Sequence, residues 1–536
     1  MSQGRSHFPS DPETLLTLVE SQAAWIAKLQ QELEQLKFAY GKLLKDRFGP
    51  KSEKLAAGQL ALFDLPEDGA PPSVPLLEDE DWEPETKRRR RGGRRKLPES
   101  LPREVIEHDL SPDEKCCPGC GVIRERIGAE TSEQLEYVPA TLKVLEHVRY
   151  KYACPHCQEH VAIADKPAKP IEKGLPGPGL LSAVGVGKFG EHLPLYRLED
   201  IFARFGVEIS RGTQCRWLKH TADLLTPLYE LMIERILRSR VIHTDDTPVS
   251  VLDPSLPKTR TGRFWVYAGD ADHPHLVYVY TPSRKRDGPM EFLKDYEGYL
   301  VADAFSGYDG IYATKNVTQV LCWAHARRKF HEAQSVQALE AQTALAFIAR
   351  LYKLEREALA ARPKDFATNP IARRHWYEQR LQLRQDRARP ILDSFQNWLL
   401  DTKLSVLPKS PVGQAIRYVL SRWDGFVRYT SDGQLPIDNN LSERSLRPCA
   451  IGRKNWLFLG NDPAGKTAAI WMSLLASAKA HEVEPWVYLR DLIDHLSQVK
   501  HRISSGTSDA VSPALDLWLP DAYLASHPSA YRKRSR

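Results

Sequence analysis

Apolar residues near the start of the chain recur at alternating steps of four and three positions. This seam makes four heptads with one polar member, and it consists of Leu15, Val19, Gln22, Ile26, Leu29, Leu33, Leu36, Tyr40 and Leu43. Such spacing is typical of a coiled coil, although a helix packed on its own chain would show the same stripe. We expect a coiled-coil helix over 12–48 that joins copies of the chain into a homo-oligomer.

A helical pattern also fills the stretch that ends near residue 236. It predicts one helix up to a break at Gly206, a turn opened by the helix-capping residue Ser210, and a second helix. This spacing is that of a helix-turn-helix, and an ordinary helical hairpin fits it equally well. We expect a helical, helix-turn-helix-like DNA-binding region over 166–236. Its second helix could present to DNA the side chains of Arg211, Gln214, Arg216 and Lys219.

After about residue 240 the pattern changes to short apolar runs typical of strands, as in "RVIHTDDTPVSVL", "GRFWVYAGD", "HLVYVYT" and "GYLVADAFSGYDG". Helical patterns return between Phe330 and Trp423. The chain is therefore predicted to be a multidomain α+β protein. We expect a catalytic domain over 237–497, with a helical insertion at about 331–425, and a C-terminal tail over 498–536. Four arginines of the insertion are expected on a solvated face that could also contact DNA: Arg373, Arg374, Arg380 and Arg384.

The chain has 536 residues, which is enough for about three or four domains. Its net charge of +6 arises from 75 basic and 69 acidic residues, so the overall balance does not define a partner. No apolar stretch reaches the length of a membrane span, and the start lacks a signal-peptide pattern. We expect a cytoplasmic, nucleoid-associated protein without a membrane partner.

Residues 49–105 mix proline, glycine and charge without a period, which predicts a linker. Within it, the run "KRRRRGGRRK" at 87–96 has eight cationic residues out of ten. Such a block attracts a polyanion, although the acidic stretch just before it would neutralise part of its charge. The linker also contains "QLALF", from Gln59 to Phe63, which resembles the short peptide that docks bacterial proteins on the replication sliding clamp.

Two close cysteine pairs, "CPGC" and "CPHC", flank a run of alternating residues. Two such knuckles joined by a hairpin are the layout of a zinc ribbon, in which four thiolates close a tetrahedral structural site. The spacer is longer than usual, and Cys116, His156 and His160 are lesser candidates. We expect a structural zinc-binding domain over 106–165, with the ligands Cys117, Cys120, Cys154 and Cys157.

Three acidic residues of the catalytic domain could form a second metal site. Asp245 and Asp303 each follow an apolar run, so both would emerge at strand ends. Glu443 lies in the first turns of a predicted helix. If they converge, they would hold two magnesium or manganese ions that clamp the attacking and leaving oxygens of a phosphoryl transfer. The alternative is that the aspartates only cap turns, and Asp246 and Asp438 are rival ligands.

The helix of Glu443 has further features. Its cap could be Asp438, Asn439 or Asn440. It is also rich in residues that seek phosphate, which is typical of a helix lying along a nucleic-acid backbone: Arg444, Arg447, Arg453 and Lys454.

The segment "GNDPAGKT" at 460–467 fits the phosphate-binding-loop pattern of nucleotide-binding proteins. Such a domain needs a further parallel sheet and a second acidic strand. Only 76 residues follow Gly460, and they show helical patterns. We therefore expect a loop before a helix, which could touch DNA phosphate, and no nucleotide partner.

Five segments follow one another in a fixed order: "HTDDTPV", "ADAFSGYDGIY", "CWAHARRKF", "IDNNLSERSLRP" and "GRKNWLFLG". Together they resemble the transposases of the insertion-sequence-66 family, which are of the DDE type with a ribonuclease-H-like α/β core. The resemblance implies an acidic triad of Asp245, Asp303 and Glu443. Cys322 and His325 look like the C-x-x-H element of DDE transposases, for which packing or substrate positioning is expected and metal binding is the alternative.

The resemblance further implies a DNA transposase that cleaves the ends of its element with magnesium or manganese and joins them to target DNA. No covalent enzyme intermediate is expected. Two other functions are compatible with the sequence: a catalytically inactive DNA-binding accessory protein, and a nuclease on the same core.

Overall fold

The computed structural model describes residues 166–504 apart from 173 and 315, residues 514–532, and parts of the chain between 16 and 36 and between 142 and 163. The chain divides into two compact units, and all but a few of the described residues belong to the first, which is made of Met1–Pro71 and Arg149–Arg536. The second unit, Pro72–Val148, holds the few others. Among the described residues, no helix combines the length and the apolar character that a membrane span requires.

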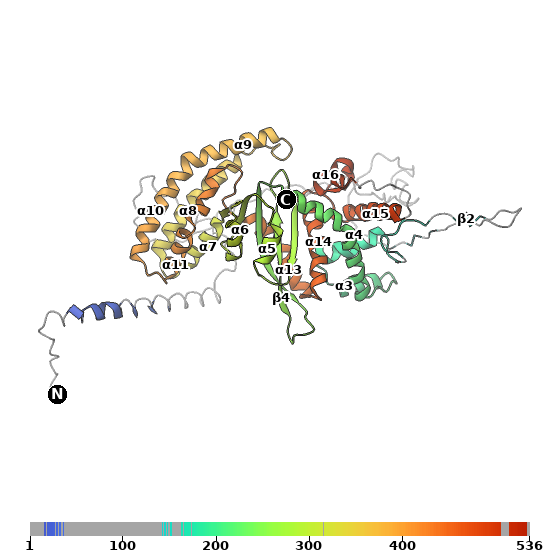
Figure 1. Cartoon of the computed structure of the whole chain (residues 1–536), viewed down its shortest axis with the longest axis horizontal. Helices are drawn as coiled ribbons and strands as arrows, with labels where there is room; N and C mark the ends of the chain where they lie inside the picture. The colour runs from blue at the N-terminus through green and yellow to red at the C-terminus, as the bar shows by residue number, and fades with distance from the viewer. Residues whose placement is uncertain are drawn as a thin grey trace, which may run out of the picture. The chain divides into compact units, whose positions relative to one another are not determined.

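A mixed sheet of six strands lies at the centre of the first unit (Figure 1). The strand order is β5-β4-β3-β6-β7, and the short strand β8 pairs with β3. β5, β4 and β3 pair antiparallel, whereas β3, β6 and β7 pair parallel. The strands are β3 (Val241–Val251), β4 (Arg260–Ala268), β5 (Leu276–Thr281), β6 (Gly298–Ala302), β7 (Val317–Leu321) and β8 (Phe458–Leu459). The mixed α+β class and the four strand patterns expected after residue 240 are confirmed.

A group of helices packs on one face of the sheet. Trp265 and Tyr267 of the sheet share a buried core with Met232 and Trp471 of these helices. The indole nitrogen of Trp471 donates to the backbone oxygen of Leu218 at 3.0 Å, which ties two of the helices together. The helices are α2 (Pro178–Gly185), α4 (Arg211–Leu237), α14 (Asp462–Ala480) and α15 (Pro485–Ser504). The predicted DNA-binding region and the sheet therefore share one hydrophobic core.

The helix-turn-helix-like pattern forms as two helices, α3 (Leu195–Ala203) and α4. Between them Gly206 has a φ of +74°, a left-handed conformation that favours glycine. Ser210 caps α4, because its side chain accepts a hydrogen bond from the backbone N–H of Thr213. Gln214 is fully buried, and its side-chain amide donates to the backbone oxygens of Leu195 and Ile209. Gln214 therefore holds the turn together and is not placed to read a base, contrary to the expectation from sequence.

Helices fill the stretch that we expected to form an insertion, and they lie together as one bundle (Figure 1). Its apolar side chains share a second core with Val301 and Val320 of the sheet. The bundle and the helices that lead to it are α7 (Trp323–Ala333), α8 (Ala338–Ala360), α9 (Pro370–Leu383), α10 (Arg389–Ser405), α11 (Pro411–Leu420) and α12 (Trp423–Val427). The insertion thus starts directly beyond the β7 edge of the sheet.

Three insertion arginines expected on a solvated face are instead structural. Arg384 is fully buried, and its guanidinium contacts the carboxylate of Glu355 at 2.7 Å and 2.9 Å. Arg380 pairs with the same carboxylate at 2.5 Å. Arg373 is buried and pairs with Asp272. A buried guanidinium needs a compensating partner, and the chain supplies one from another helix or loop, so these residues do not form a DNA-binding face.

The segment that resembles a phosphate-binding loop does not form a loop. Helix α14 begins at Asp462, where Asn461 caps it by accepting a hydrogen bond from the N–H of Ala464 at 2.9 Å. Gly465 lies inside the helix, and a Cβ there would meet the ring of Tyr280 at 2.5 Å. This glycine therefore serves close packing between α14 and β5. We expected a loop over 460–467, but the helix begins at Asp462, several residues earlier than expected.

The described parts of the expected C-terminal tail, 498–504 and 514–532, are folded. Helix α15 continues to Ser504, and a further helix, α16 (Pro520–Ser526), follows. Tyr523 is buried in the first core, and the hydroxyl of Tyr488 donates to the backbone oxygen of Trp518 at 2.8 Å. The chain between 514 and 532 thus packs on the first core.

Four expectations fall wholly or mostly outside the described residues. The coiled-coil helix expected over 12–48 is described only in part. The described residues there are helical and exposed, in agreement with a helix: 16, 17, 19–26, 28, 29, 32, 33 and 36. The sliding-clamp peptide and the basic run at 87–96 are likewise outside. Of the zinc-binding domain the structure describes one antiparallel pair, β1 (Lys151–Tyr152) with β2 (Ala162–Ile163), but not the four cysteines.

Candidate active site

Strand register brings Asp245 and Asp303 together. β3 and β6 run parallel, with His243 opposite Val301. The pairing ends there, and Asp245 and Asp303 each follow that pair by two residues. The charge of Asp303 acts on Asp245, so the two carboxylates are neighbours. Asp303 directly follows β6, as expected. Asp245 lies in the middle of β3 and not at a strand end, because β3 continues to Val251 in its antiparallel pairing with β4.

The carboxylate of Asp245 is in an unfavourable electrostatic environment. Its pKa is raised to about 7, chiefly by burial and also by the negative charges of Asp303, Asp246 and Glu443, against a hydrogen bond from the N–H of Asp246 that lowers it. Three neighbouring carboxylates therefore act on Asp245 in a largely buried place. A divalent cation would relieve this repulsion, so the donor set fits magnesium or manganese, which prefer oxygen ligands.

Asp246, the rival ligand, is fully engaged elsewhere. Successive side chains of a strand point to opposite faces, so Asp246 leaves β3 on the side away from Asp245. One of its oxygens accepts from Arg263 at 2.8 Å, and the other accepts from Arg284 at 2.9 Å and 3.1 Å. Its side chain is 3 % exposed. Asp246 is therefore the anion of a buried ion pair.

Asn439 fixes the start of the helix that carries Glu443. This helix, α13 (Asn440–Trp456), begins after Asn439, but the side chain of Asn439 does not cap it. Its amide donates to the backbone oxygen of Thr244 at 2.8 Å, and its carbonyl lies 3.1 Å from Nδ1 of His243. Burial lowers the pKa of His243 to about 4, so the ring is neutral and donates from Nδ1. Glu443 is thereby held one helical turn from the strand of Asp245.

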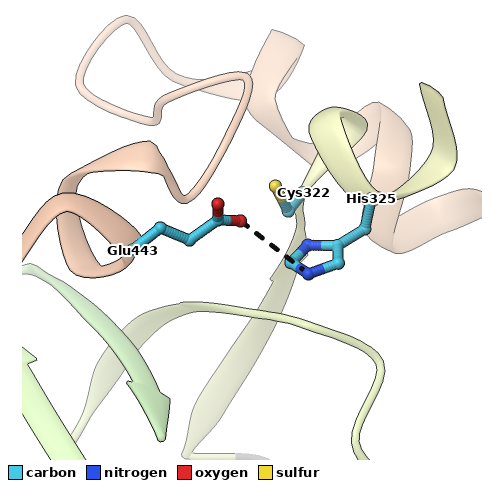
Figure 2. A group of neighbouring side chains, drawn as sticks. All are labelled: Cys322, His325 and Glu443. Atoms are coloured by element: carbon cyan, nitrogen blue, oxygen red, sulfur yellow. Dashed lines mark ion pairs between the residues drawn. The ribbon is translucent and has the colours of Figure 1, made fainter. Parts of the chain in front are cut away.

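The carboxylate of Glu443 faces Cys322 and His325 at the start of α7 (Figure 2). Nε2 of His325 lies 3.8 Å from Oε1 of Glu443, and the guanidinium of Arg328 lies 3.8 Å from its Oε2. Cys322 is buried, and its sulfur accepts a hydrogen bond from the N–H of Asn439 at 3.2 Å. Oε1 of Glu443 and Nδ1 of His325 are buried and lack a hydrogen-bond partner.

Among the described residues, Cys322, His325 and Glu443 are the group of three possible metal ligands whose ligand atoms all lie within 4.8 Å of one another. The three acids Asp245, Asp303 and Glu443 are not such a group in this conformation. The structure thus brings the helix of Glu443 beside the aspartates, while the Glu443 side chain is directed toward α7.

Asp438, the second rival ligand, connects the site to the insertion. One of its oxygens accepts from the hydroxyl of Tyr352 on α8 at 3.0 Å and from the side-chain amide of Asn440 at 2.7 Å. Its other oxygen accepts from the N–H of Asn440 at 3.1 Å. Because these bonds occupy both oxygens, Asp438 anchors the loop before α13.

The basic residues of α13 differ in their surroundings. Arg444, Arg447 and Lys454 are exposed. Arg453 donates to the hydroxyl of Thr247 at 2.9 Å and to the backbone oxygen of Pro248, so it also fastens α13 to β3. On α4, Arg211, Arg216 and Lys219 are exposed, and Lys219 pairs with Asp223 at 2.7 Å.

Comparison with known proteins defines the class. The family described as "Transposase IS66 family" matches residues 173–467, and "zinc-finger binding domain of transposase IS66" matches residues 114–158, which contain both cysteine pairs. A third description, "Transposase C of IS166 homeodomain", matches residues 35–106. These matches place the protein among the transposases. Because the first covers more than half of the chain, the protein belongs to the IS66 transposase family.

Similar proteins occur in Sinorhizobium fredii (strain NBRC 101917 / NGR234). The chain is 30 % identical to its uncharacterized protein y4jD, over 92 % of this chain and 95 % of that protein. It is 34 % identical to its uncharacterized protein y4qI, over 78 % of this chain and 76 % of that protein. The likeness therefore extends over nearly the whole chain.

Several residues of the site were not found from the sequence. The bracing role of Asn439 depends on His243 and Thr244, which are distant in sequence. The two arginines that bind Asp246 come from β4 and from the segment after β5. One signal was available: polar residues such as His243 and Thr244 inside an apolar strand must find buried partners.

Proposed function

We propose that the protein is a DNA transposase with a ribonuclease-H-like catalytic core, in which Asp245, Asp303 and Glu443 hold two magnesium or manganese ions. The observation that carries this proposal is the parallel pairing of β3 with β6, beyond which Asp245 and Asp303 follow at matching positions, while Asn439 holds the helix of Glu443 against β3. The mixed sheet supports such a core, because three antiparallel strands precede two parallel ones.

The proposed mechanism assigns each acid a task. Asp245 and Asp303 form the fixed part of the site, because both are set by sheet register. Glu443 completes it by turning from His325 toward the aspartates. When bound, the two cations would activate the attacking water or 3′-hydroxyl and stabilise the leaving oxygen. Asp245 must lose its proton before the site can bind a cation.

DNA would be held by exposed basic residues on two helices. Arg444, Arg447 and Lys454 of α13 lie on the helix of Glu443, where phosphate contacts would position the cleaved strand. Arg453 is a further candidate for a phosphate contact, because only Nη1 of its guanidinium donates to Thr247 and Pro248 of β3. Arg211, Arg216 and Lys219 of α4 form a second basic surface. Gln214 is omitted because it is buried.

The N-terminal region would recognise element ends and assemble the multimer. The match to an IS66 zinc-finger domain supports structural zinc bound by Cys117, Cys120, Cys154 and Cys157. The heptad seam supports homo-oligomerisation through the N-terminal helix. The sliding-clamp peptide at Gln59 to Phe63 is proposed as an accessory contact.

The function is tested with a labelled duplex that carries the end of the element. Wild-type protein with magnesium is expected to nick the end and to join it to a target duplex, and Glu443→Gln is expected to do neither. Equal cleavage by both proteins would overturn the catalytic assignment. Cleavage without joining would favour a nuclease, and end binding without cleavage would favour an accessory protein.

A further inference from the structure

The group formed by Cys322, His325 and Glu443 combines three different ligand chemistries: a thiol, an imidazole and a carboxylate (Figure 2). Magnesium takes oxygen ligands and does not favour sulfur. Zinc and similar ions accept all three donors. The group of Cys322, His325 and Glu443 therefore prefers a different metal ion from the pair of Asp245 and Asp303.

The geometry of the group is close to that of a zinc site. In a tetrahedral zinc site with bond lengths of about 2.0–2.3 Å, ligand atoms lie roughly 3.3–3.8 Å apart. Here the three ligand atoms lie within 4.8 Å of one another, and Nε2 of His325 is 3.8 Å from Oε1 of Glu443. Glu443 has three rotatable side-chain bonds, so its carboxylate can adjust its position toward a bound ion.

Two ligands are fixed before any ion binds. Cys322 lies at the N-cap of α7, and His325 follows it by three positions, so one helix start positions both. The sulfur of Cys322 accepts a hydrogen bond from the N–H of Asn439. By contrast, Oε1 of Glu443 and Nδ1 of His325 are buried without a hydrogen-bond partner. Buried polar atoms without partners are costly, and a bound cation would satisfy Oε1.

The charges also balance. A divalent ion with one thiolate, one carboxylate and a neutral imidazole has a net charge of zero, which suits a place where Cys322 is 1 % exposed. Binding requires that the thiol of Cys322 release its proton to solvent. No oxidation or reduction takes place, and a water molecule can fill the fourth position.

We propose that Cys322, His325 and Glu443 bind one zinc-class ion, and that Glu443 is shared between this site and the triad with Asp245 and Asp303. When the zinc-class site is filled, the carboxylate of Glu443 stays at α7 and the magnesium site lacks its third acid. The site would therefore hold the enzyme in a resting state. This inference goes beyond the proposed function, because it describes metal binding by the protein without DNA.

The test titrates cobalt(II) into the metal-free full-length protein, because loading with zinc would also fill the proposed site. Cobalt bound by a thiolate has a charge-transfer absorption, and wild-type protein is expected to bind about one equivalent of cobalt beyond that held by Cys117, Cys120, Cys154 and Cys157. Cys322→Ser is expected to lose this further equivalent and its absorption, while its hydroxyl can still accept the hydrogen bond from Asn439. Cys215→Ser, which changes an exposed cysteine, is the matched control and is expected to keep it.

The other two ligands are tested in the same titration. His325→Ala and Glu443→Gln are each expected to raise the cobalt dissociation constant roughly 10-fold or more, since each removes one of three ligands. An absorption that is equal in wild type and Cys322→Ser would overturn the proposal. Unfolding curves of each variant show whether a loss reflects misfolding. Because no DNA is present, this result does not depend on whether the protein cleaves element ends.

Discussion

Asn439 donates its side-chain amide to the backbone oxygen of Thr244 at a distance of 2.8 Å. Both residues are fully buried. The bond joins the start of the helix that carries Glu443 to the strand residue next to Asp245. Two members of the proposed triad that are distant in sequence are thus connected through one amide, and the sulfur of Cys322 is connected to the same residue.

The first prediction concerns this amide. Asn439→Ala would leave the oxygen of Thr244 and Nδ1 of His243 without partners, so we expect a loss of about 2–4 kcal/mol in the free energy of unfolding. We also expect a marked loss of magnesium-dependent cleavage. Denaturant unfolding and the cleavage assay measure the two effects. Asn440→Ala is the control, because the Asn440 side chain bonds to Asp438 and not to β3. Equal stability and equal cleavage in the two variants would contradict the role of the Asn439 amide in joining α13 to β3.

The second prediction concerns pH. The folded-state pKa of Asp245 is raised to about 7 from 3.8, chiefly by burial, so its ionisation destabilises the fold as pH rises between these values. Asp245→Asn removes this cost and is expected to stabilise the metal-free protein by about 4 kcal/mol above pH 7, with the gain disappearing near pH 4. Thermal unfolding at several pH values without added magnesium measures it. If the difference in stability between Asp245→Asn and wild type did not change with pH, the ionisation of Asp245 would not be its cause.

The third prediction concerns the competition between magnesium and the proton of Asp245. Below pH 7, a cation must displace the proton of Asp245, so magnesium affinity is expected to fall by up to about tenfold per pH unit. Calorimetric titration in buffers of different ionisation enthalpy measures the protons released. Affinity that is constant between pH 5 and pH 7 would show that Asp245 does not bind the ion.

The buried arginines of the insertion give a stability prediction. Glu355→Ala leaves Arg380 and Arg384 without their shared carboxylate, so we expect a loss of about 3–5 kcal/mol. Glu357→Ala removes the exposed partner of Arg387 and should cost less than about 1 kcal/mol. Denaturant unfolding compares the two. Similar costs would mean that the burial of Arg384 does not determine the strength of its ion pair.

The helix α14 gives a packing prediction. Gly465→Ala places a Cβ 2.5 Å from the ring of Tyr280, so we expect a loss of about 1–3 kcal/mol in stability. Gly460→Ala has no atom within 4 Å of its new Cβ and serves as the control from the same segment. Thermal unfolding of both variants measures this difference. A stable Gly465→Ala variant would contradict the close packing of α14 on β5.

The fold was predictable where a pattern is local. Apolar runs predicted β3, β4, β5 and β6, and the capping role of Ser210 followed from its place before a helix. The run quoted for β3 covers the whole strand, but the place of Asp245 within it was not predicted. Asp245 was expected at a strand end because it follows the apolar pair Val241 and Ile242, whereas β3 continues to Val251 in its pairing with β4.

The site was predictable as residue types and not as contacts. Carboxylates after apolar runs made Asp245 and Asp303 candidates, a predicted helix start added Glu443, and the family resemblance joined the three into a triad. The burial of Arg384 and Gln214 was missed, since each depends on partners that a helical pattern does not contain. The direction of the Glu443 side chain toward His325 was missed for the same reason.

The most direct measurement of the central claim is manganese binding by the protein with element-end DNA, followed by electron paramagnetic resonance. Each of Asp245→Asn, Asp303→Asn and Glu443→Gln is expected to bind fewer manganese ions than wild type. Asp246→Asn, whose carboxylate is bound by two arginines, is expected to bind as many as wild type. Equal manganese binding in wild type and all three triad variants would contradict the account.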